Sequence, residues 1–235
     1  MPPLSTMPPV KIDQAELALF GKQWQANGQK LSRTPPYSSS NLGKMFDRKV
    51  GEALAELLGK IPVMTPNKNA LIPAQPDCVE VGECRIVGGV RPQNFDVGYR
   101  PDGVRFAFDS KTLNDSKSVQ KNYQNMINDL STEATTVHTR FPYAVVAFLV
   151  AVPISCLISP QQEALTETLL RLTSRNSPLD SAHKAEAISL VLWNPYTGEI
   201  DDAHPASSSI LRIEAFSRQV EQAYVDRYRG LPPHV

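Results

Sequence analysis

The chain lacks the signatures of several common classes of enzyme. It has only three cysteines among 235 residues, an odd number without zinc-site spacing, which we interpret as reduced thiols in a cytoplasmic protein. No glycine-rich phosphate loop, dinucleotide fingerprint or nucleophile with triad spacing is present. The sequence therefore gives no reason to expect an organic cofactor, a structural zinc ion or covalent catalysis.

Long apolar runs and a charge imbalance are also missing. The first residues do not resemble a signal peptide, and the longest apolar run, residues 141–157, contains Pro142 and Pro153, so we expect no membrane association. The 24 basic residues equal the 24 acidic ones. Any binding of nucleic acid must therefore depend on local basic patches and bound metal ions.

What is present is a soluble α/β pattern. Apolar residues at helical spacing predict helices at 13–26, 44–58, 116–136, 160–175 and 216–228. Runs of β-favouring residues predict strands at 78–90, 94–100, 104–111, 143–152 and 187–193. Residues 28–43 have the composition of a loop. We expect an N-terminal arm and helix (1–42), a core (43–200) and a C-terminal helical extension (201–235).

The segment 94–111 is the most informative stretch, because Pro101-Asp102-Gly103 has the composition of a turn between two strands. If Asp102 and Gly103 alone form the loop, Asp96 lies opposite Asp109, with Cβ atoms about 5 Å apart. Lys111 shares the face of Asp109. A glycine bulge at the turn would instead shift the pairing by one and turn Asp96 away, unless a second bulge at Gly98 restores it.

Two carboxylates this close cannot both stay ionised without a cation. A divalent metal held by Asp96 and Asp109 resolves the repulsion and leaves Lys111 able to orient or deprotonate a water. Asp102 is roughly 20 Å from Asp109 along the strand, too far to share the ion. The alternative is that Asp109 and Lys111 form only a surface ion pair.

The pattern Asp96-x(12)-Asp109-x-Lys111 on a hairpin resembles the motif of the PD-(D/E)XK nuclease superfamily, and most closely its type II restriction endonucleases. The resemblance covers the hairpin and, more loosely, residues 43–152, with Phe95 in place of the proline. It implies a restriction-endonuclease-like core: a helix, a three-stranded meander, a crossover helix and a further strand in a mixed central sheet flanked by helices.

The resemblance also implies roles for individual residues. Asp96 and Asp109 would bind Mg²⁺, or Mn²⁺ in its place, together with the backbone carbonyl of Ser110, and Lys111 would position the attacking water. Many relatives carry an acid on the helix before the meander, and Glu52 best matches that place. Otherwise Glu52 is a surface residue that pairs with a neighbouring base.

Basic residues near the motif predict contacts to DNA phosphates. Those we single out lie in the loop before the second helix, on that helix and in the first turns of the third: Arg33, Lys44, Arg48, Lys117 and Lys121. The alternative is that they are solvated surface charges.

The function implied is hydrolysis of DNA phosphodiester bonds by a metal-dependent endonuclease, most simply a sequence-specific restriction enzyme. Such enzymes usually bind double-stranded DNA as homodimers whose two-fold axis matches a palindrome. The same motif serves repair, junction-resolving and phage-defence nucleases. A nuclease-like fold that binds nucleic acid without catalysis is a further alternative.

Overall fold

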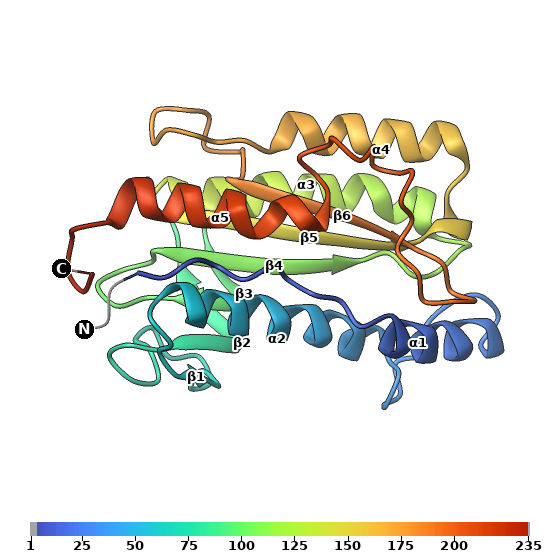
Figure 1. Ribbon diagram of the computed structural model, residues 1–235, viewed down its shortest axis with the longest axis horizontal. Coiled ribbons are helices and arrows are strands. Elements are labelled where there is room, and N and C mark those ends of the chain that lie inside the picture. Colours follow the sequence, from blue (N-terminus) through green and yellow to red (C-terminus); the bar gives the residue numbers. More distant parts are fainter. Residues whose placement is uncertain (1–3, 235) are drawn as a thin grey trace.

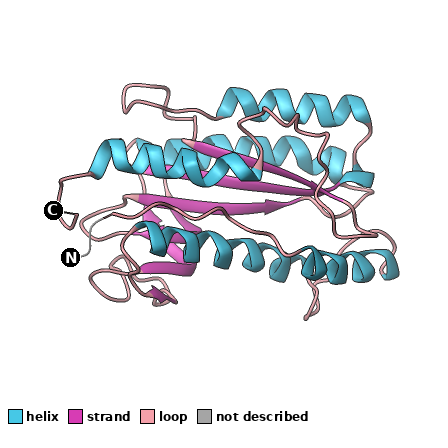
Figure 2. Ribbon diagram, viewed as in Figure 1, coloured by secondary structure: helices cyan, strands magenta, loops and turns pink. Residues whose placement is uncertain are grey.

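The computed structural model describes residues 4–234, apart from the side chain of Gln120, and these residues form an α/β fold (Figures 1 and 2). The strands are β1 (Val63–Met64), β2 (Val79–Val87), β3 (Pro92–Tyr99), β4 (Phe106–Thr112), β5 (Val145–Pro153) and β6 (Ala187–Trp193). The α-helices are α1 (Gln14–Ala26), α2 (Ser39–Leu57), α3 (Val119–His138), α4 (Ser159–Leu172) and α5 (Ile213–Tyr228).

Within the described residues the strands form one six-stranded mixed sheet in the order β1-β2-β3-β4-β5-β6. The meander β2-β3-β4 is antiparallel, whereas β4, β5 and β6 run parallel, and the short β1 is parallel to β2. We predicted that the motif strand and the strand after the crossover helix are neighbours in the sheet. This is confirmed, because β4 pairs with β5 and α3 connects them. The order helix, meander, crossover helix, strand is present in α2 to β5.

Helices cover both faces of the sheet (Figure 1). On one face, Phe108 of β4 packs edge-on against Phe216 of α5, with ring centroids 6.0 Å apart. On the other face, Lys111 contacts Glu133 of α3. Since side chains three residues apart on a strand point to opposite faces, α5 and α3 lie on opposite sides of β4. α4 lies beside α3, where the hydroxyl oxygens of Tyr123 and Thr168 are 3.3 Å apart.

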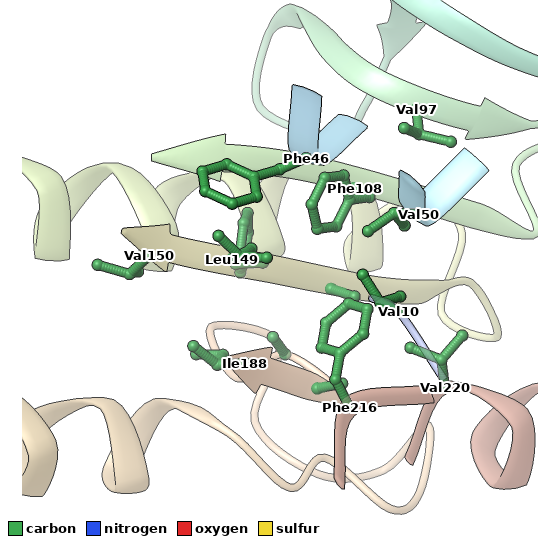
Figure 3. Packing of buried hydrophobic residues seen from close by; sticks show 14 of the residues in the cluster. Val10, Phe46, Val50, Val97, Phe108, Leu149, Val150, Ile188, Phe216 and Val220 are labelled. Atoms are coloured by element: carbon green, nitrogen blue, oxygen red, sulfur yellow. The ribbon is translucent and has the colours of Figure 1, made fainter. Parts of the chain in front are cut away.

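One hydrophobic core joins these layers. β5 and β6 are buried along their whole length, as expected of parallel strands covered on both faces. Figure 3 shows core side chains from α2, from β3 to β6 and from α5, with Val10 of the N-terminal segment among them. Buried residues from all three predicted segments, such as Leu17, Phe46 and Phe216, belong to this cluster. The cysteines are buried free thiols, as predicted.

The predicted loop 28–43 is too long. α2 begins at Ser39, because the side chain of Ser38 accepts a hydrogen bond from Asn41 N–H and caps the helix. The five residues 39–43 are therefore helical. This earlier start brings Gly43 onto the helix, where it faces the sheet.

Candidate active site

The motif hairpin has the register that the sequence predicted for a two-residue turn. Val97 pairs with Phe108, and Tyr99 pairs with Phe106. The loop itself is longer than predicted, running from residue 100 to residue 105, with Gly103 at a φ of +123°. The printed pairs of β3 and β4 show no register shift, so the predicted second bulge at Gly98 is not needed to keep Asp96 on the face of Asp109. The bulge in the meander lies instead in β2, between Val81 and Cys84.

The two strands separate just beyond this ladder, and Asp96 occupies the point of separation. The ladder stops at Val97–Phe108, although β3 begins five residues earlier at Pro92 and β4 continues to Thr112. Asp96 Oδ2 accepts a hydrogen bond from Ser110 N–H at 3.1 Å and lies 3.4 Å from the Ser110 hydroxyl oxygen. The Asp96 carboxylate thus takes the place of a β3 backbone carbonyl as the acceptor for this N–H of β4, and Asp96 and Asp109 are brought together.

The helix acid beside the motif is Asp47, not Glu52. Gly43, one turn earlier on α2, approaches β4 so closely that a Cβ there would lie 3.1 Å from the Ser110 hydroxyl oxygen. Asp47 follows on the same face of α2 and is only 5% exposed. Glu52 is exposed and lines a separate groove with Lys11, Lys49 and Lys60. Five residues on a helix turn a side chain by about 140°, which places Glu52 away from the sheet.

A second acid that the sequence analysis missed comes from the crossover helix. Glu133 of α3 is 4% exposed, and its Oε1 accepts a hydrogen bond from Lys111 Nζ at 2.7 Å. Lys111 Nζ also donates to Asp109 Oδ2 at 2.5 Å. The predicted ion pair between Asp109 and Lys111 therefore exists, but it is mostly buried and shared with a third charged group, unlike a surface pair.

The pKa values of this cluster are shifted because several carboxyl groups are buried close to one another. Burial is the largest cause that raises the pKa of Asp96 to about 9, and a hydrogen bond to Asp109 and the charge of Asp109 add to it. Burial also raises the pKa of Asp47 to about 7, although a hydrogen bond with Ser110 opposes the shift. The pKa of Glu133 is raised to about 7 by burial and by the charge of Asp109, against the effect of Lys111.

The same environment acts on Lys111 in the opposite sense. Burial alone lowers the pKa of Lys111, but the charges of Asp109 and Glu133 outweigh it and raise this pKa above its ordinary value. Lys111 is therefore an ammonium in this arrangement. It can donate hydrogen bonds to a phosphate or to a water, and it is not suited to remove a proton.

The donor set has the chemistry of a site for a hard divalent cation. Carboxylate oxygens are the ligands that Mg²⁺ prefers, and here Asp47 Oδ1 and Glu133 Oε2 are buried without a hydrogen-bond partner among the described residues. Within residues 4–234, however, no group of three or more His, Cys, Asp or Glu side chains is already arranged around a common ion position. The reason is visible in the contacts: Lys111 occupies Asp109 Oδ2, and Ser110 occupies Asp96 Oδ2.

A polar groove opens beside this cluster, beyond the carboxyl end of β4. Its volume is about 600 Å³, and Thr112, which follows Lys111, is part of its wall. The loop before α2 contributes Lys30, Ser32 and Arg33, and the start of α3 contributes Ser118 and Asn122.

The predicted DNA-contacting residues divide between this groove and other positions. Arg33 lines the groove, and Lys117 and Lys121 are exposed at its α3 side. Lys44 is exposed on α2, close enough to Asp47 to oppose the rise in its pKa. Arg48 points elsewhere, with its guanidinium 4.0 Å from the carboxylate of Glu16.

No protein-family model matches the chain, and no curated protein and no solved structure is significantly similar to it. The place of the chain among known proteins therefore depends on its residues and their geometry. Among the helices of the described chain, none has both the length and the apolar character needed to cross a bilayer.

Proposed function

We propose that the protein is a metal-dependent endonuclease that hydrolyses phosphodiester bonds of double-stranded DNA. The observation that carries this proposal is the cluster at the point where β3 and β4 separate: Asp47, Asp96 and Asp109 converge beside one ammonium, that of Lys111. Without a cation, buried carboxyl groups must stay protonated near pH 7, which costs folding free energy. A cluster of such groups therefore indicates a site where a bound ligand compensates the cost. A divalent cation is the ligand whose charge and chemistry match.

In this proposal Asp96 and Asp109 hold Mg²⁺, with the backbone carbonyl of Ser110 as a third ligand and Asp47 in the place first assigned to Glu52. A bound Mg²⁺ supplies a Lewis acid for the scissile phosphate and lowers the pKa of a bound water. Mn²⁺, with the same ligand preferences, should substitute.

The residues of the chain supply the remaining functions. To act as a ligand, Asp96 would release to solvent the proton that its raised pKa retains. Lys111, held as an ammonium, donates hydrogen bonds that orient the attacking water or the non-bridging phosphate oxygens. Ser110 fixes the Asp96 carboxylate through its backbone N–H.

The polar groove beside the cluster supports a nucleic acid as the substrate. A phosphodiester at Lys111 would continue past Thr112 into this groove, where Arg33, Lys30 and the hydroxyl groups of Ser32 and Ser118 face it. Lys117 and Lys121 extend the basic surface along α3. We further propose sequence-specific cleavage by a homodimer, as in type II restriction, with repair, junction-resolving or defence nucleases as the alternative uses of the same chemistry.

The test is incubation of the protein with plasmid and bacteriophage DNA in Mg²⁺, analysed on a gel. Discrete fragments support sequence-specific cleavage, whereas a smear or cleavage confined to branched DNA supports one of the alternative nucleases. Asp109→Ala and Lys111→Ala should abolish cleavage without unfolding the protein. The matched control is Asp102→Asn, an exposed acid of the same hairpin, paired with Arg105, which should cleave like the wild type.

If the wild type leaves every DNA intact in both Mg²⁺ and Mn²⁺, and calorimetry detects no metal binding, the hydrolase proposal is wrong. The fold would then be better interpreted as a non-catalytic binding protein. Cleavage that persists in purified Asp109→Ala protein would contradict the role of the cluster directly.

A further inference from the structure

Lys111 is held by two acids from different elements. Its Nζ lies 2.5 Å from Asp109 Oδ2, on its own strand, and 2.7 Å from Glu133 Oε1, on α3. The side chains of Lys111 and Glu133 are 19% and 6% exposed, so water does little to screen this contact. An acid from the crossover helix thus contacts the half-buried ammonium of Lys111.

The two acids are not equivalent once a metal is considered. Asp109 Oδ2 is occupied by Lys111, so a metal that binds Asp109 competes with the ammonium for this carboxylate. Lysine has a long and flexible side chain, and one that loses its partner is free to leave the site. Glu133 also contacts Lys111 but is not among the proposed metal ligands, so this contact can persist when a metal binds Asp109.

The sequence around Glu133 gives it no packing role that explains its position. Met126, Leu130 and Val137 form the buried stripe of α3, and Glu133 lies in line with them. A buried carboxylate costs free energy at such a place, and its Oε2 has no hydrogen-bond partner among the described residues. The contact with Lys111 is the interaction that compensates its burial.

We propose that Glu133 is a positioning residue that keeps Lys111 at the reacting phosphate when the metal occupies Asp109. This inference rests on the proposed nuclease function. It assigns to α3 a part of the active site that the hairpin motif does not contain. Glu133 acts through Lys111, touching neither the metal nor the DNA.

A double-mutant cycle separates this role from that of a metal ligand. The variants are Glu133→Gln, Lys111→Met and the double variant, with Asp129→Asn, an exposed acid one turn earlier on α3, as the control. The variants that retain Lys111 are assayed for kcat and KM on cleaved DNA, and every variant is assayed for the Mn²⁺ dissociation constant by calorimetry. Circular dichroism establishes that each variant is folded.

We expect Glu133→Gln to lower kcat by roughly 10- to 100-fold, the usual range for residues that orient an active-site group, with KM changed by less than about threefold. Because loss of the Lys111 ammonium should itself abolish cleavage, the Lys111→Met background is compared by Mn²⁺ affinity alone. Mn²⁺ binding should weaken severalfold in Glu133→Gln, because Lys111 then depends on Asp109 alone and competes more strongly. In the Lys111→Met background Glu133→Gln should leave Mn²⁺ affinity unchanged.

Loss of Mn²⁺ affinity on Glu133→Gln in both backgrounds would show that Glu133 is a metal ligand, and the inference would be wrong. Wild-type kcat in Glu133→Gln would also overturn it, while leaving the nuclease proposal intact. A wild-type protein that neither binds Mn²⁺ nor cleaves DNA would overturn the nuclease proposal itself, and the two failures are therefore distinguishable.

Discussion

Two buried charge clusters lie at opposite ends of the parallel strands, and they are balanced in opposite ways. At the amino end of β6, Glu186 Oε1 accepts hydrogen bonds from Arg175 at 2.9 Å and lies 2.8 Å from Arg227. Its Oε2 accepts from Val146 N–H at 2.7 Å and lies 3.2 Å from His138 Nε2. One acid there meets four partners.

In the cluster at the carboxyl end of β4, the acids outnumber their partners. Asp109 and Glu133 share Lys111, while Asp47 and Asp96 lie close enough to Asp109 for its charge to raise their pKa values. One oxygen of Asp47 and one of Glu133 lack a hydrogen-bond partner among the described residues. Burial alone would raise the pKa of Glu186, but the hydrogen bond and charge of His138 and the charge of Arg227 lower it. Equal burial thus gives lowered pKa values where partners are supplied and raised ones where they are not. The first cluster is complete as a structural element, whereas the second has more carboxyl groups than partners, as the proposed cation site requires.

Neutralising one acid in each cluster should therefore change stability in opposite directions. Glu186→Gln leaves Arg175 and Arg227 buried without their counter-charge and should lower the free energy of unfolding by about 3–5 kcal/mol. Asp96→Asn removes a carboxyl group that burial and the neighbouring acids force to remain protonated. The amide oxygen of the asparagine can still accept the hydrogen bond from Ser110 N–H. We expect this substitution to raise the free energy of unfolding by roughly 2 kcal/mol without metal.

Urea denaturation at pH 7.5 in EDTA measures both values. Asp129→Asn, which alters an exposed acid of α3, should lie within about 0.5 kcal/mol of the wild type. Destabilisation of similar size in Asp96→Asn and Glu186→Gln would show that the two clusters are equally structural.

The second-largest effect that we expect is on how the free energy of unfolding depends on pH, which should differ between the two clusters. Because the pKa of Asp96 is raised to about 9, and those of Asp47 and Glu133 to about 7, the folded protein holds more protons than the unfolded chain above pH ~4. The contribution of these three carboxyl groups to the free energy of unfolding is complete below the pKa that they have in the unfolded chain. It is lost as pH rises through the raised pKa values that they have in the folded protein. Without metal, the free energy of unfolding should fall between pH 6 and pH 9, by about 1.4 kcal/mol per pH unit for each proton involved.

Mg²⁺ should reverse most of this fall, since it favours the ionised carboxylates and stabilises the folded state by mass action. Glu186 has finished titrating below this range because its pKa is lowered, so Glu186→Gln should keep the slope. Asp96→Asn should have a shallower slope and a smaller response to Mg²⁺. Thermal melts at several pH values, with Mg²⁺ or EDTA, test this, and identical slopes in the wild type and Asp96→Asn would contradict it.

The sequence predicted the candidate site residues that lie on strands, namely Asp96, Asp109 and Lys111. It did not predict those on helices, Asp47 and Glu133. The turn at Pro101-Asp102-Gly103 and the alternation of the arms left two registers open, one of which placed Asp96 beside Asp109, and the observed pairing is that one. The loop proved longer, from residue 100 to residue 105, yet the register was unchanged. Strand β5 was recognisable by its apolar faces, and its position next to β4 followed from the handedness of the crossover.

Asp47 and Glu133 were missed for a common reason. Their partners are 63 and 22 residues away along the chain, so no local spacing relates them to the motif. Each does stand within an apolar helical stripe, Asp47 in line with Val50 and Leu54, and Glu133 in line with Leu130 and Val137. An acid inside a buried stripe was therefore a better criterion than similarity to a family position, which favoured the exposed Glu52.

The smallest effect that we expect concerns the groove beside the acidic cluster. If DNA phosphates follow the groove, Arg33→Ala should weaken DNA binding by about 1 kcal/mol and reduce the slope of log K against log salt by about 1. Lys60→Ala is the matched control, since Lys60 follows the far end of α2, roughly 30 Å from Ser39. Binding is measured in the Asp109→Asn background by fluorescence anisotropy of a labelled duplex over a range of NaCl concentrations. Equal slopes for Arg33→Ala and Lys60→Ala would mean that the groove lies off the path of the DNA, and that the basic residues around it are solvated charges.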